Sequence, residues 1–89
     1  MRILIVEDEK NLCDMIGKSL HSAGYEVDLC YDGEDALEMI YAEKYDLIVL
    51  DLNLPGVDGM EILRELRKEN EETKVLILSA RSQIADKVD

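Results

Sequence analysis

Two patterns of apolar residues alternate along the chain. Short unbroken apolar runs are separated by longer stretches in which apolar residues recur every three or four positions. Unbroken runs are typical of strands buried on both faces of a parallel sheet, and the recurring spacing is typical of the helices that cover it. The predicted strands are residues 2–6, about 26–30, 46–50 and 74–78. The chain therefore predicts an α/β fold in which helices connect parallel strands.

The first two helices are predicted between these strands. In the first helix, one apolar stripe is formed by Leu12, Ile16, Leu20 and Ala23. We expect this helix to stop at Gly24, because glycine readily adopts the left-handed conformation found past helix ends. The second helix is predicted from near Gly33 to Ala42.

A third helix is predicted from Asp58 to about Asn70. The Asp58 side chain can accept hydrogen bonds from amides of the first turn, and Glu61 follows three residues later as in a capping box. Just before this helix, Pro55 and Gly56 fix a turn. We interpret this stretch as a turn within one domain.

Length and charge limit the class of protein. The 89 residues suffice for one small domain. A last helical stripe, Ile84, Ala85 and Val88, ends without a cap, so residues 1–89 are expected to form a partial domain cut inside a helix. The net charge of −11 repels nucleic acid and anionic membranes. The sequence has neither a membrane-length apolar run nor a leader, and we expect a cytoplasmic protein.

Three predicted strands are followed by residues that can do chemistry. Glu7 and Asp8 follow the first strand, Asp51 follows the third, and Ser79 follows the fourth. Parallel strands joined by right-handed crossovers bring their carboxyl ends to one edge, where open α/β sheets bind ligands. If the strand order is 2-1-3-4, Asp8 and Asp51 face each other across neighbouring strands.

Carboxylates brought together in this way repel each other unless a proton, a basic group or a cation intervenes. Oxygen ligands from Glu7, Asp8, Asp51 and a loop carbonyl favour Mg²⁺, and no His or Cys lies nearby to favour zinc. With Mg²⁺ bound, Asp51 can attack phosphorus to form an aspartyl phosphate. The Ser79 hydroxyl can then donate to a phosphoryl oxygen.

Several of these residues also have ordinary structural interpretations. Asp8 or Glu9 can cap the first helix, and Ser79 can satisfy nearby backbone groups. Asp58 is better explained as a helix cap than as a ligand. Single residues do not decide between the two interpretations, but the convergence of three strand ends favours a functional site.

The two thiols and the single histidine are assigned no chemistry. Cys13 and Cys30 lack CxxC spacing, and we expect both to be buried as small apolar side chains. His21 lies on a polar stretch of the first helix and is expected at the surface, not in a phosphate relay.

Three segments resemble one known family. They are Ile-Leu-Ile-Val-Glu-Asp-Glu at 3–9, Asp-Leu-Ile-Val-Leu-Asp-Leu-Asn-Leu-Pro-Gly-Val-Asp-Gly at 46–59, and Val-Leu-Ile-Leu-Ser-Ala at 75–80. They are similar to the receiver domains of bacterial two-component response regulators, most of all to the OmpR/PhoB branch. The resemblance covers the whole chain and implies a flavodoxin-like, doubly wound parallel sheet.

The resemblance also implies roles for individual residues. Asp51 would accept phosphate from a sensor histidine kinase, and Ser79 would be the switch hydroxyl. Glu7, Asp8 and Asp51 would bind Mg²⁺, and Asn53 would contribute its backbone carbonyl. The domain would be a signalling module, not an enzyme, and would control an output domain, of a transcriptional kind, that lies outside this sequence.

The sequence departs from the family at its carboxyl end, where a fifth strand bearing a lysine and a fifth helix are missing. Lys10, Lys74 and Lys87 lie outside the lysine motif. Without the lysine of the fifth strand, a bound phosphoryl group lacks a charge-assisted contact worth about 1.5 to 3 kcal/mol, so we expect weak phosphorylation. Strand 74–78 would become an open edge, and we expect a homodimer through it or through exchange of residues 80–89.

Two other interpretations stay open. The chain can be a fragment that keeps the fold and the metal site without phosphotransfer. It can also be a Mg²⁺-dependent phosphohydrolase of the haloacid dehalogenase type, which likewise uses an Asp nucleophile. That class needs an Asp two residues after the nucleophile as general acid, and here the position is Asn53.

Overall fold

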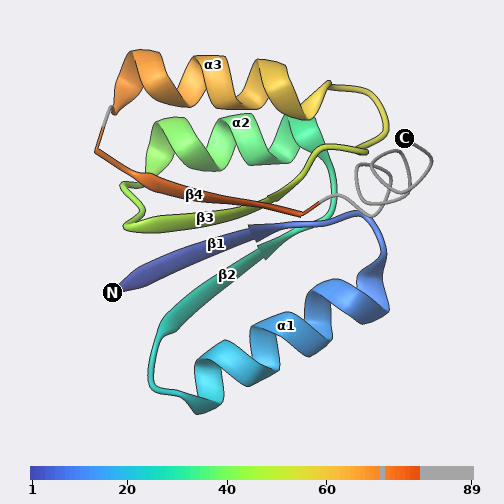
Figure 1. The fold of residues 1–89 in the computed structure, drawn as a ribbon, viewed down its shortest axis with the longest axis vertical. Helices are drawn as coiled ribbons and strands as arrows, with labels where there is room; N and C mark the ends of the chain where they lie inside the picture. Colours follow the sequence, from blue (N-terminus) through green and yellow to red (C-terminus); the bar gives the residue numbers. More distant parts are fainter. Residues whose placement is uncertain (71, 79–89) are drawn as a thin grey trace, which may run out of the picture.

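The computed structural model describes residues 1–70 and 72–78, within which strands and helices alternate (Figure 1). The strands are β1 (Arg2–Val6), β2 (Glu26–Cys30), β3 (Leu47–Asp51) and β4 (Lys74–Leu78). The helices are α1 (Lys10–Ser22), α2 (Gly33–Ala42) and α3 (Gly59–Glu69). The predicted α/β alternation is confirmed, and only β3 is displaced, by one residue. The helix predicted around residues 84–88 lies outside the described residues.

The described strands form one parallel sheet with the order β2-β1-β3-β4, as predicted. In the register of the sheet, Val6 pairs with Cys30 on one side and with Leu50 on the other. The chain runs outward from β1 to β2 and then returns to β3, so the winding reverses between β1 and β3. The carboxyl ends of these two strands therefore lie next to each other at the point where such sheets bind ligands.

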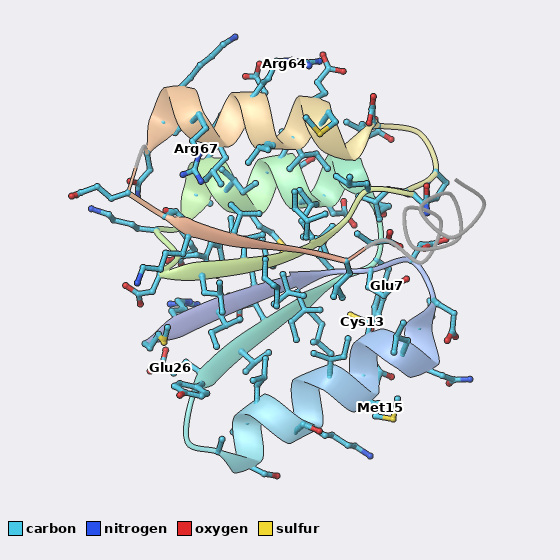
Figure 2. All side chains as sticks on the ribbon, in the orientation of Figure 1. Glu7, Cys13, Met15, Glu26, Arg64 and Arg67 are labelled. Carbon is cyan, nitrogen blue, oxygen red and sulfur yellow. The ribbon has the colours of Figure 1, made fainter. Side chains whose placement is uncertain are left out.

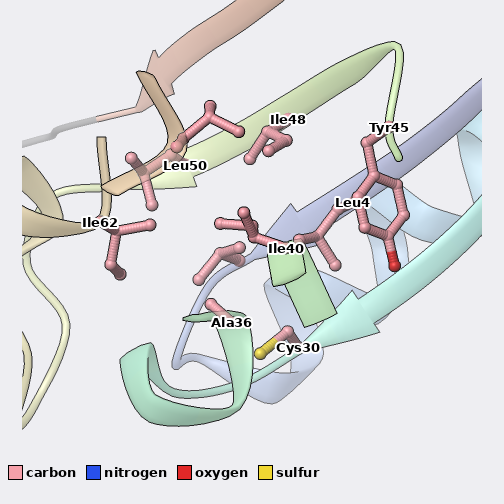
Figure 3. Close-up of a cluster of buried hydrophobic side chains, with 10 residues drawn as sticks. Leu4, Cys30, Ala36, Ile40, Tyr45, Ile48, Leu50 and Ile62 are labelled. Atoms are coloured by element: carbon pink, nitrogen blue, oxygen red, sulfur yellow. The ribbon is translucent and has the colours of Figure 1, made fainter. Parts of the chain in front are cut away.

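Helices cover both faces of the sheet, with α1 on one face and α2 and α3 on the other (Figure 1). The core on the α1 side contains Ile3, Ile5, Cys13 and Val49. The core on the other side contains Leu4, Val6, Cys30, Ala36, Ile40, Tyr45, Ile48, Leu50, Ile62 and Leu66 (Figure 3). Successive residues of β1 thus enter opposite cores, which explains its unbroken apolar run.

The buried stripe of α1 differs from the prediction. Its fully buried positions are Cys13 and Gly17, whereas Ala23 is exposed and the larger apolar residues of the predicted stripe are half-buried. A Cβ atom on Gly17 would lie 2.7 Å from Leu29 Cδ2. Small residues occupy the centre of the contact because α1 packs so closely on β2, and the large side chains lie at its margins.

Three helix ends agree with their predicted caps, although the hydrogen bonds of the described residues include none from the Asp58 amide to the Glu61 side chain, as a capping box would have. The Glu9 carboxylate accepts from two first-turn amides of α1, at 3.1 and 3.2 Å. Asp58 Oδ1 accepts from the Met60 amide at 3.0 Å and caps α3. Gly24, just past α1, has a φ of 99°, in the left-handed region expected there. These contacts leave Asp8 free of a capping role, since Glu9 holds the start of α1.

Strand β4 is less buried than its apolar run predicted, and its exposure agrees with the open edge expected for residues 74–78. Leu76 is 53% exposed and Ile77 is 43% exposed. Within the described residues β4 is an edge strand that pairs with β3 alone, whereas α1 packs on the opposite half of the sheet. Burial on both faces was wrong for this strand because an apolar run does not state how many neighbours a strand has. No helix in the described part of the chain is long and apolar enough to span a bilayer.

Candidate functional site

Three carboxylates meet at the carboxyl edge of the sheet. Glu7 and Asp8 follow β1, and Asp51 ends β3, the next strand in the sheet. One oxygen atom from each carboxylate lies within 4.8 Å of the other two. Figure 2 shows Glu7 at this edge, near the start of α1. The predicted convergence of these three residues is therefore confirmed.

Backbone amides orient two of these carboxylates. The Asn53 N–H donates to Asp51 Oδ1 at 2.9 Å, and the Glu9 N–H donates to Glu7 Oε2 at 2.8 Å. In each case the amide lies two residues beyond the acid, in the loop that leaves the strand. The loops that follow β1 and β3 thus fix one oxygen of each carboxylate.

The charges of this cluster are poorly compensated by the protein. Glu7 is 5% exposed and Asp51 is 8% exposed, and no basic side chain in the described ranges forms an ion pair with either. Burial, followed by the negative charge of Asp51, raises the pKa of Glu7 to about 7, although the Glu9 amide opposes this rise. A site of this kind favours the binding of a cation.

The donor atoms fit a hard divalent cation. All three side chains offer oxygen, and their oxygen atoms are close enough to share one ion. Asp8 is exposed, so the cluster opens to solvent on one side. Mg²⁺ prefers a small number of carboxylates together with several waters, which is compatible with a half-open cluster.

The loop of residues 52–58 is held close to Asp51 by the start of α3. A Cβ atom on Gly59 would lie 2.7 Å from Leu52 Cα and 3.2 Å from the Asp51 carbonyl oxygen. Gly56, inside the loop, has a φ of 85°. The turn that leaves β3 therefore favours glycine at position 56 for its backbone conformation and at position 59 for its close contact with the strand end.

A second close contact was missed from the sequence. Gly33, the first residue of α2, lies against Val57 of the same loop, with 2.6 Å between a Cβ built on Gly33 and Val57 Cβ. The available signal was the glycine at the first position of both α2 and α3. Glycine is a weak helix former, so its presence at two helix starts beside the site indicates close packing.

Other predicted residues are placed as follows. Ser79 lies outside the described residues, although its neighbour Leu78 pairs with Asp51 in the register of the sheet. Cys13 and Cys30 are buried free thiols, as expected. Burial raises the pKa of both, that of Cys30 to about 11, which leaves them unreactive at neutral pH. His21 is exposed, as expected.

The sequence matches the family model of the response regulator receiver domain over residues 3–89. The chain belongs to this family, and its CheY-like fold is the flavodoxin-like sheet that the sequence predicted. It is therefore the receiver domain of a two-component response regulator, a signalling domain.

Among curated relatives, the transcriptional regulatory protein DltR of Streptococcus agalactiae is 45% identical over 89 residues. The match covers 100% of this chain and 40% of DltR, so the chain spans well under half the length of that regulator.

Solved structures give the same assignment. Response regulator TrrA of Thermotoga maritima, in complex with Mg²⁺-BeF, is 38% identical, with a TM-score of 0.86 over 96% of this chain and 74% of TrrA. In the complex of TrrA with histidine kinase ThkA, TrrA is 39% identical to this chain, with a TM-score of 0.81 over 89% of this chain and 68% of TrrA. A response regulator from Burkholderia pseudomallei, with a phosphorylated aspartic acid, a calcium ion and citrate, is 25% identical, with a TM-score of 0.86 over 98% of this chain and 51% of that protein.

Proposed function

We propose that this domain accepts a phosphoryl group on Asp51 in a Mg²⁺-dependent reaction. The observation that carries the proposal is the convergence of Glu7, Asp8 and Asp51 within 4.8 Å at the strand edge where the winding of the sheet reverses. The structures of TrrA with Mg²⁺-BeF and of the Burkholderia protein with a phosphorylated aspartic acid support it.

Each residue of the cluster has a part in the proposed reaction. Glu7, Asp8, Asp51 and the Asn53 carbonyl would hold Mg²⁺, and the ion would offset the charge of the incoming phosphoryl group. The Asn53 amide donates to Asp51 Oδ1, which leaves Oδ2 as the oxygen available to the donor. Oδ2 forms the new bond to phosphorus, while the bond from phosphorus to the donor breaks and the donor keeps the electron pair. Ser79 donates its hydroxyl to the bound phosphoryl group and signals its presence.

The proposed donor is a sensor histidine kinase, as in the complex of TrrA with ThkA. The phosphorylated domain would act in the cytoplasm and control an output segment that regulates transcription, as the name of DltR suggests. In this proposal the domain is a stoichiometric acceptor and not an enzyme. Asn53 supports this view, because its amide side chain cannot serve as the general acid that a phosphohydrolase of this type needs.

The test is intact mass spectrometry after incubation with Mg²⁺ and a small acyl phosphate. We expect a single phosphoryl adduct on the wild type, formed slowly, and none on Asp51→Asn or after chelation of Mg²⁺. Asp58→Asn is the matched control, because Asp58 is an exposed cap and Asn caps helices equally well.

Two outcomes would contradict this function. An adduct that persists in Asp51→Asn would place the acceptor elsewhere, and multiple turnover of a phosphate ester would support the hydrolase. If the folded wild type forms no adduct at all, the remaining interpretation is a fragment that keeps the fold without phosphotransfer.

We also propose that this chain self-associates through β4. The supporting observation is the exposure of Leu76 and Ile77 on a strand that has one partner within the described residues. Such an edge offers unpaired amides and carbonyls to a second strand.

A further inference from the structure

The loop of residues 52–58 rests on the first turn of α2. At this contact Gly33 is buried and has no side chain, and a Cβ atom there would lie 2.6 Å from Val57 Cβ and 3.3 Å from the Val57 carbonyl oxygen. A Cβ–Cβ distance of 2.6 Å lies far inside van der Waals contact. A methyl group at position 33 would therefore displace either α2 or the loop.

The helix is the better anchored of the two. Ala36 is fully buried and Ile40 is 6% exposed, and both pack in the core beneath α2. The Asp32 side chain accepts from the Asp35 amide at 2.8 Å and fixes the first turn of α2. A shift of α2 would disturb these contacts together, which is costly in a close-packed core.

The loop is less firmly packed than α2 at Val57, the residue before the helix cap Asp58. Val57 is half-buried, and the preceding Gly56 adopts a left-handed conformation next to Pro55. The atom of Val57 in contact is its Cβ, which is bonded directly to the backbone, so a change of rotamer cannot relieve the contact. A methyl group at position 33 would therefore move the loop backbone at Val57.

Both ends of this loop lie close to Asp51, the residue of the acidic cluster that ends β3. At one end the Asn53 amide donates to Asp51 Oδ1, and at the other Gly59 packs against Leu52 Cα. With only seven residues from 52 to 58, a displacement at Val57 must be taken up near these ends. The position of α2 is thereby linked to the orientation of the Asp51 carboxylate.

We propose that Gly33 is a positioning residue for Asp51. Because it has no side chain, Val57 can lie directly on α2, and the loop is held where the Asn53 amide orients the carboxylate. The expected effect on Mg²⁺ affinity rests on the proposed function, whereas the expected displacement of the loop does not.

The first test is the affinity for Mg²⁺, measured by titration calorimetry on the folded wild type and Gly33→Ala. We expect binding about tenfold weaker in Gly33→Ala, as for other residues that orient metal ligands. Gly17→Ala is the matched control, because a Cβ at Gly17 would meet the flexible end of Leu29, on β2. It is expected to lower stability and leave the affinity for Mg²⁺ unchanged.

The second test needs no metal. In amide NMR spectra of the metal-free protein, Gly33→Ala should shift the signals of Asn53 and Val57, and Gly17→Ala should not. Adding Val57→Gly to Gly33→Ala removes the clashing Cβ, so it should return the Asn53 signal toward its wild-type position.

The proposal would be overturned if the NMR signals that move in Gly33→Ala all belonged to α2. An equal loss of Mg²⁺ affinity in Gly33→Ala and Gly17→Ala would also overturn it. If the wild type itself fails to bind Mg²⁺, the proposed function fails, and the Asn53 and Val57 signals still decide the role of Gly33.

Discussion

At the scale of single residues, Glu7 is changed most clearly by its surroundings. Burial and the charge of Asp51 raise its pKa from 4.5 to about 7. Between these values the folded protein binds a proton that the unfolded chain has released, and this difference favours folding. The stabilisation from the protonated carboxyl group is complete below pH 4.5 and is lost as the pH rises through 7.

We therefore predict that metal-free wild type loses stability from pH 4.5 to 7 relative to Glu7→Gln. Each pKa unit corresponds to about 1.4 kcal/mol, so the relative loss is on the order of 3 kcal/mol. Urea unfolding at several pH values measures it, and Mg²⁺ should reverse the loss at neutral pH in the wild type. Parallel stability curves for the two proteins would show that Glu7 is not the group responsible.

At the scale of secondary-structure elements, each helix is held at its start by an acidic side chain. Glu9 caps α1, Asp32 caps α2 and Asp58 caps α3. All three acids are therefore engaged with backbone amides at the same edge of the sheet as the metal cluster. This explains why an edge so rich in acids contributes only a few of them to the site.

For α3 the cap can be tested without touching the site. Asp58→Ala removes the acceptor for the Met60 amide and should lower the free energy of unfolding by about 1 kcal/mol. Asp58→Asn should remain close to wild type, because asparagine caps helices as well as aspartate does. Chemical denaturation compares the three proteins, and an asparagine variant as unstable as the alanine variant would argue against capping.

At the scale of the whole molecule, the two edges of the described sheet differ. The edge strand β2 begins with the exposed Glu26, a charge that discourages pairing with another chain, whereas β4 has four consecutive apolar residues after Lys74. In an antiparallel pair centred on Leu76, that residue would face its own copy. Such a pair would bury apolar side chains that are otherwise exposed.

We predict a wild-type dimer by light scattering, with dissociation of Leu76→Lys because like charges then face each other. Mixing Leu76→Lys with Leu76→Glu should restore the dimer. Met15→Lys, at a residue of α1 that is 59% exposed and points away from the sheet (Figure 2), should remain dimeric. A monomeric wild type at high concentration would refute self-association, and a dimer that survives Leu76→Lys would indicate exchange of residues 80–89.

Much of the fold could be predicted from local patterns. Apolar runs located the strands, and caps located both ends of α1 and the start of α3, because both signals depend on residues that are neighbours in sequence. Contacts between distant segments were harder to predict. Tyr45 is 3% exposed, and its hydroxyl donates to Asp28 at 2.7 Å, but nothing near it in the sequence announces this partner.

By itself, the sequence determined the alternation of strands and helices and the acids that end the strands. Parallel topology then required Glu7, Asp8 and Asp51 to meet, since strand ends share one edge. Only the tertiary structure decided that α1 buries Cys13 and Gly17, and that Gly33 lies directly against Val57 in the loop after Asp51. These features depend on how closely particular backbones approach, and that distance is set by packing between elements, which the order of residues does not state.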